Sequence, residues 1–145
     1  MTLAICSNVA CNGGESPVVG DKTDVIVFVT RRLDTGMFEA YKAEDQAFIE
    51  KVRKALQEDL KQPDRRSGDG LGMSVNHVLV FRNKNGETTS FEILGDEFLV
   101  VDSTRYSAQE TIRSLKNARA EEALHAISAD EARRLVPSKV DGYLQ

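Results

Sequence analysis

Val75–Leu94 (VNHVLVFRNKNGETTSFEIL) holds two apolar, β-branched segments on either side of the dipeptide Asn85-Gly86. Asn-Gly tolerates the positive φ angles of a type I′ turn, so this pattern predicts a β-hairpin with a two-residue loop. In that register one face of the hairpin carries Val78, Val80, Phe91 and Ile93. The other face carries Leu79, Phe81, Ser90 and Glu92. We expect the first face, which is wholly apolar, to be buried in the core.

Two more strands are predicted around this hairpin. Asp24–Thr30 (DVIVFVT) is apolar without alternation, which is typical of a strand buried on both faces near the centre of a sheet. Phe98–Val101 follows a turn and is predicted to be the third strand of a meander. Because this third strand would lie at a sheet edge with few charges, a homodimer formed by strand pairing is also an expectation.

The helices are indicated by periodicity and by capping residues. Residues 43–61 are predicted to form an amphipathic helix, with apolar side chains at every fourth position: Phe48, Val52, Leu56 and Leu60. The tetrapeptides that begin at Ser107 and Ser128 are capping boxes, each with Glu three residues after Ser. They predict a helix over 107–127 and a short helix that ends before Pro137.

These elements define the expected fold class. We predict an α+β protein with a mostly antiparallel sheet, the element order β-α-β-β-β-α-α and two main helices packed on one face. The chain of 145 residues has the usual size of one domain. We expect an irregular N-terminal arm at 1–23, one domain at 24–136 and a C-terminal tail at 137–145.

Charge and hydropathy restrict the partners. The formal net charge is -4, whereas nucleic acids and anionic membranes are bound mainly through Lys and Arg, so we expect no nucleic-acid partner. No segment reaches the length of about 20 apolar residues needed to span a bilayer, and we expect no membrane span. The cytoplasm is the expected compartment.

The N-terminus offers an alternative compartment. Val9-Ala10-Cys11, followed by a Gly- and Ser-containing segment, resembles the end of a bacterial lipoprotein signal, which implies export and lipid anchoring through Cys11. Asn8 departs from that pattern, and the segment lacks a basic start. Cys6 and Cys11 could instead form a disulfide or remain two free thiols, and the sequence leaves this open.

The order of helix 43–61, three strands and helix 107–127 resembles that of double-stranded RNA-binding domains. That family contacts phosphates with a lysine cluster at the start of its second helix. Here the corresponding residues, 107–113, contain one basic side chain. The resemblance is therefore limited to element order and does not change the expectation of no nucleic-acid partner.

Metal and catalytic motifs receive little support. Glu122 and His125 have E-x-x-H spacing on a predicted helix, but a di-iron bundle needs a second such pair, so we expect no metal and no cofactor. His77 lies on a predicted strand, where a lone histidine is more often structural than catalytic. Because no nucleophile or paired-carboxylate motif stands out, catalytic residues stay unknown, and whether the chain is an enzyme is uncertain, leaning to no.

Two groups of residues are candidates for binding. The Gly-rich loop 62–74 contains Arg65, Arg66 and Asp69, whose charged groups could contact a ligand or partner. An acidic surface near the meander could attract a basic partner and would contain Glu92, Asp96, Glu97 and Asp102. The leading hypothesis is a non-enzymatic protein-binding module, such as an inhibitor or immunity-type protein, acting through that surface. The alternative is a small enzyme or small-molecule-binding protein with a pocket covered by loop 62–74.

Overall fold

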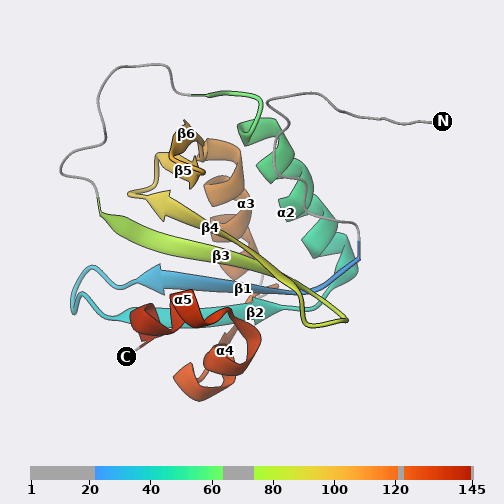
Figure 1. The fold of residues 1–145 in the computed structure, drawn as a ribbon, viewed down its shortest axis with the longest axis vertical. Coiled ribbons are helices and arrows are strands. Elements are labelled where there is room, and N and C mark those ends of the chain that lie inside the picture. The colour runs from blue at the N-terminus through green and yellow to red at the C-terminus, as the bar shows by residue number, and fades with distance from the viewer. Residues whose placement is uncertain (1–21, 64–73, 121–122, 145) are drawn as a thin grey trace.

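A computed structural model shows an α+β domain built on one sheet of seven strands (Figure 1). It describes residues 22–63, 74–120 and 123–144. The strands are β1 (Thr23–Arg31), β2 (Phe38–Ala43), β3 (Val75–Asn83), β4 (Thr88–Leu94), β5 (Phe98–Val101), β6 (Thr104–Ser107) and β7 (His125–Ile127). The helices are α2 (Gln46–Asp59), α3 (Gln109–Ala120), α4 (Ala129–Leu135), α5 (Ser138–Asp141) and the 3₁₀ helix η1 (Gly142–Leu144).

Every neighbouring pair in the sheet is antiparallel, and the strand order is β6-β5-β4-β3-β1-β2-β7. β1 lies between β3 and β2, which confirms the prediction of a strand buried on both faces. Its even-numbered residues Ile26 and Phe28 belong to one core, and its odd-numbered residues Val25, Val27 and Val29 belong to the other.

Helices cover both faces of the sheet. α2 and α3 pack on the face that carries Ile26 and Phe28, as predicted for the two main helices, through apolar residues such as Val52 and Leu115. The C-terminal helices α4, α5 and η1 lie on the opposite face, over β1 and β2 (Figure 1).

The C-terminal prediction was therefore wrong. Residues 138–144 form α5 and η1, and the side chains of Val140 and Leu144 are only 2% and 4% exposed against the sheet. A fully apolar central strand needs cover on both faces, and this segment supplies part of it. The sequence pattern concealed this role because each of these helices is no longer than four residues.

The hairpin exists, but its predicted register was wrong by one residue. Leu79 pairs with Phe91 rather than with Glu92, because the loop contains residues 84–86. Gly86 has φ +83°, and its N–H donates to Asn83 O at 3.0 Å, which is the type I turn with a following left-handed glycine found in three-residue hairpin loops.

Because of this one-residue shift, each β4 side chain lies on the face of the sheet opposite to the one predicted from its pairing with β3. The residues that share the α2/α3 core are Leu79, Phe81, Phe91 and Ile93. Val78 and Val80 lie on the opposite face, the one covered by α5, together with Ser90 and Glu92. Asn83 holds the longer loop, since its side-chain oxygen accepts from the backbone N–H groups of Asn85 and Glu87.

Strands β2, β6 and β7 were not predicted. β6 pairs with β5 on the side away from β4, so Phe98–Val101 is an interior strand and the predicted edge for a homodimer does not exist there. β6 also places a fourth strand between α2 and α3, which breaks the element order of double-stranded RNA-binding domains.

The start of α3 also differs from the prediction. Ser107 Oγ accepts from Gln109 N, while the next two N–H groups of the helix donate to the carboxylate of Asp59, which is fully buried at the end of α2. α3 ends at Ala120, and residues 125–127 form a strand instead of a last helical turn. The N-cap of α4 is as predicted, because Ser128 Oγ accepts from Glu131 N at 3.1 Å.

Within the three ranges that the structure covers, no helix has the length and apolar character needed to cross a bilayer.

Candidate functional site

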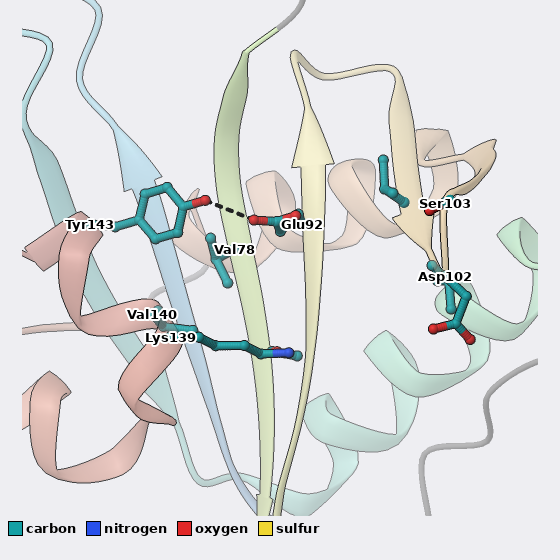
Figure 2. A pocket seen from close by; sticks show the side chains of 10 residues that line it. Val78, Glu92, Asp102, Ser103, Lys139, Val140 and Tyr143 are labelled. Atoms are coloured by element: carbon teal, nitrogen blue, oxygen red, sulfur yellow. Dashed lines mark hydrogen bonds between the residues drawn. The ribbon is translucent and has the colours of Figure 1, made fainter. Parts of the chain in front are cut away.

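Two hollows lie on opposite faces of the sheet. The first, called the strand pocket, has a volume of about 390 Å³, and Figure 2 shows its lining side chains. Its floor is apolar, with Val78 from β3 and Val140 from α5. Tyr143 donates to Glu92 across this floor at 2.7 Å, and Asp102 and Ser103 form the β5–β6 turn on the far side.

Six of the ten residues that line the strand pocket are polar, and three of these six are charged. Burial and the hydrogen bond to Glu92 raise the pKa of Tyr143 to about 12, so its hydroxyl stays protonated and acts as a donor. Glu92, Asp102 and Lys139 are all solvent-exposed. The strand pocket therefore lacks a set of buried polar groups that converge on one point.

The second hollow, called the His77 cleft, has a volume of about 650 Å³. It lies at the end of the sheet where the β1–β2 turn, the start of β3, the β4–β5 turn and α3 meet. Its polar lining residues are Thr30, Arg31, Arg32, Asp34, Glu39, Tyr41, Asn76, His77, Asp96, Lys116 and Arg119, and Leu33 is its apolar residue. The volume of this cleft lies within the range of small-molecule sites, although its lining is more polar than in most of them.

One wall of the His77 cleft is a chain of hydrogen bonds from a hydroxyl to an ammonium group. Thr30 Oγ1 lies 2.8 Å from His77 Nδ1, and His77 Nε2 lies 2.5 Å from Asp96 Oδ1. Lys116 Nζ donates to the other oxygen of Asp96 at 2.9 Å. The imidazole also stacks on Phe28, with ring centroids 5.3 Å apart.

This chain of hydrogen bonds determines the tautomer of the imidazole. An ionised carboxylate can only accept, so His77 Nε2 carries the proton and donates it to Asp96. Nδ1 then holds a lone pair and accepts from the Thr30 hydroxyl. His77 is held in place by partners from β1 and from the β4–β5 turn.

The electrostatics agree with a neutral His77. Burial lowers the pKa of His77 and outweighs the hydrogen bond to Asp96, which acts in the opposite direction. For Asp96, burial raises the pKa, but the hydrogen bonds from His77 and Lys116 outweigh it and lower the pKa overall. At neutral pH the pair is therefore a neutral imidazole and a carboxylate.

The opposite wall is a second polar chain, formed largely by β2 and α3. Tyr41 donates to Glu39 Oε2 at 2.8 Å, and Arg119 donates to the Tyr41 hydroxyl at 3.0 Å while its guanidinium lies over the Tyr41 ring. Arg32 donates to Glu39 Oε1 and holds Asp34 through two further N–H groups. Burial is the main cause of the raised pKa of Tyr41, so this hydroxyl also remains a donor.

The predicted site residues are only partly brought together. Glu92 and Asp102 line the strand pocket, whereas Asp96 lines the His77 cleft on the other face of the sheet. Glu97, in the same turn as Asp96, lines neither hollow. The four carboxylates are therefore divided between the two hollows and the surface, and their joint action as one acidic surface stays a prediction.

Other predicted groups do not form sites in the described residues. Arg65, Arg66 and Asp69 lie outside them, as do Cys6, Cys11 and Glu122. His125 begins strand β7, so the proposed E-x-x-H helix is wrong there. Across residues 22–63, 74–120 and 123–144, no three His, Cys, Asp or Glu side chains are grouped as metal ligands.

Sequence reasoning missed most of the His77 cleft. Tyr41 and Glu39 belong to β2, which was not predicted because its sequence FEAYKA is short and half polar. His77 was noticed, but its partners Thr30 and Asp96 are 47 and 19 residues away along the chain. The one available signal was a histidine at an inward position of a strong strand, since a buried imidazole needs partners.

Comparisons of this chain with protein-family models, curated proteins and solved structures found no match.

Proposed function

We propose that this chain is a non-enzymatic protein-binding module that docks through the tip of its β1–β2 hairpin. The observation that carries the proposal is the exposure of two large apolar side chains in this short turn. Leu33 is 93% exposed and Met37 is 59% exposed, and they are the large hydrophobic residues exposed in the described part of the chain. Figure 1 places the turn at one end of the sheet.

Hydrogen bonds within the hairpin stabilise the conformation of this turn. Arg32 N donates to Met37 O at 2.7 Å, and Gly36 N donates to Arg32 O at 2.8 Å. The Arg32 guanidinium clamps Asp34 on one side and reaches Glu39 on the other. A loop that is already ordered loses little conformational entropy on binding, which favours affinity.

The partner we propose offers an apolar socket for Leu33. Burying a leucine side chain contributes about 2 kcal/mol, or roughly 30-fold in Kd. The net charge of -4 favours a basic protein partner, as for an inhibitor or immunity-type protein, and disfavours nucleic acid. This proposal replaces the acidic surface by the hairpin tip as the docking element.

A photo-crosslinking amino acid at position 33 tests the proposal in the native host. We expect one protein to be crosslinked from position 33, and the substitution Met37→Asp to abolish that product. The same crosslinker at Lys84, an exposed position in the β3–β4 loop, is the matched control. Docking through the tip would be refuted if positions 33 and 84 gave the same crosslinked proteins in equal amounts. It would also be refuted if the crosslink from position 33 persisted in the Met37→Asp variant.

A second candidate function is the binding of a small molecule, and the convergence of polar groups in the His77 cleft favours it. In the described residues, buried apolar side chains fill the interface of the sheet with α2 and α3. The cleft lies at the end of the sheet instead. Loop residues 64–73, the proposed lid, lie outside the described residues.

The compartment is also a proposal. We propose the cytoplasm, with export and lipid anchoring through Cys11 as the alternative. Intact mass of the protein from its native host separates the two, because lipid anchoring removes residues 1–10 and adds acyl chains to Cys11.

A further inference from the structure

The carboxylate groups of the His77 cleft already have donors from the protein. Both oxygens of Asp34 accept from Arg32, and the two oxygens of Glu39 accept from Arg32 and Tyr41. The two oxygens of Asp96 pair with His77 and Lys116. The carboxylate charges of the cleft are therefore already paired within the protein.

The donors, in contrast, exceed the acceptors. Lys116 has three N–H groups, and among the described residues it uses one of them on Asp96. Arg119 has five, and its one hydrogen bond to a described residue is to the Tyr41 hydroxyl. The two residues lie three positions apart on α3, so they point from the same side of the helix into the cleft.

We propose that the His77 cleft binds a small organic anion through a carboxylate or phosphate group held by Lys116 and Arg119. An arginine fork takes two oxygens of such a group at once, and a lysine adds a third charge-assisted hydrogen bond. The volume of about 650 Å³ leaves room for an organic part beside the Tyr41 ring. This inference rests on the second candidate function, small-molecule binding in the His77 cleft, and the cleft shares Arg32 and Leu33 with the hairpin tip.

Amide chemical shifts recorded during titration with inorganic phosphate and, separately, with acetate test this site. Ionic strength is held constant with chloride, because exposed charges are screened by salt. We expect saturable shifts confined to α3, β2 and the β4–β5 turn. Phosphate and acetate distinguish the two possible head groups, and acetamide, which is neutral, should cause no saturable shift.

The variants separate a specific site from general attraction. Lys116→Gln combined with Arg119→Gln should weaken binding by about tenfold or more, since each removes a charge-assisted hydrogen bond. Arg119→Lys keeps the charge without the fork and should fall between this variant and the wild type. Arg113→Gln is the matched control on the same helix, because Arg113 pairs with Glu110 and does not line the cleft.

Three results would overturn the proposal. One is shifts that rise linearly without saturation for both anions in the wild type. Another is equal affinity in the wild type and in the Lys116→Gln, Arg119→Gln variant. The third is binding of acetamide to the same amides as tightly as acetate. Because both residues are exposed, the variants should fold, and the dispersion of their amide spectra checks this.

Discussion

Asp59→Ala should be among the most destabilising single substitutions in this protein. Asp59 is fully buried where α2 ends, and its carboxylate caps the start of α3. It accepts from Glu110 N at 3.2 Å, from Thr111 N at 2.8 Å and from the Thr111 hydroxyl at 2.7 Å. Removing it leaves these donors without a partner in the interior.

Three overlapping contributions determine how far Asp59→Ala lowers the free energy of unfolding. Loss of an N-cap costs about 0.5–2 kcal/mol, and each buried donor left unpaired costs about 1–3 kcal/mol. A negative charge at a helix N-terminus contributes up to about 2 kcal/mol when partly buried. Because these describe the same contacts, they cannot be summed, and we expect a total loss of about 3–5 kcal/mol. Asp59→Asn keeps one acceptor oxygen and should cost about half as much.

Urea unfolding followed by circular dichroism measures this loss, with an unchanged m-value as evidence that only stability has changed. Glu58→Ala is the matched control, since Glu58 is the preceding residue and makes an exposed pair with Lys61. We expect Glu58→Ala to change the free energy of unfolding by less than about 0.5 kcal/mol. A loss below about 1 kcal/mol for Asp59→Ala would refute the role of this carboxylate as the cap of α3.

Three further predictions concern other parts of the fold. The free energy of unfolding should fall as the pH drops below 6.5, the ordinary pKa of histidine, because the lowered pKa of buried His77 lets the unfolded chain take up the proton first. Because the pKa of Asp96 is lowered in the folded protein, the free energy of unfolding should fall further below pH 3.8. In urea unfolding measured at a series of pH values, His77→Gln should reduce the loss of stability that begins below pH 6.5. Ser103→Gly should stabilise the protein by about 0.5–1 kcal/mol, since Ser103 has φ +68° in the β5–β6 turn; an unchanged urea midpoint would contradict this. Leu144→Ala should cost about 2–4 kcal/mol, measured by urea unfolding, whereas a frayed tail would give no change.

The local elements were predictable where a short segment carried its own signal. The apolar β1 segment, the four-residue spacing of α2 and the N-cap at Ser128 all appear in the structure. β2 and β6 were missed because six or four residues of mixed polarity carry too little periodicity. Their place in the sheet depends on neighbouring strands.

The candidate site was less predictable than the fold. Thr30, Tyr41, His77, Asp96 and Arg119 come from five different elements, and each looks ordinary in its own segment. Their relation depends on the sheet order, which brings β3 next to β1 and the β4–β5 turn next to α3. No short motif could have indicated this group.

The sequence by itself determined that a hairpin forms at Asn85-Gly86, that β1 is central and that two amphipathic helices pack on a sheet, because these follow from local turn chemistry and apolar periodicity. Only the tertiary structure decided which residues of the two hairpin strands share a face, since a loop longer by one residue reverses one strand relative to the other. It also decided that Asp59 caps α3 and that Leu144 packs over β2. These outcomes depend on contacts between residues far apart in the chain. Such contacts contribute to stability only after the helices have packed on the sheet.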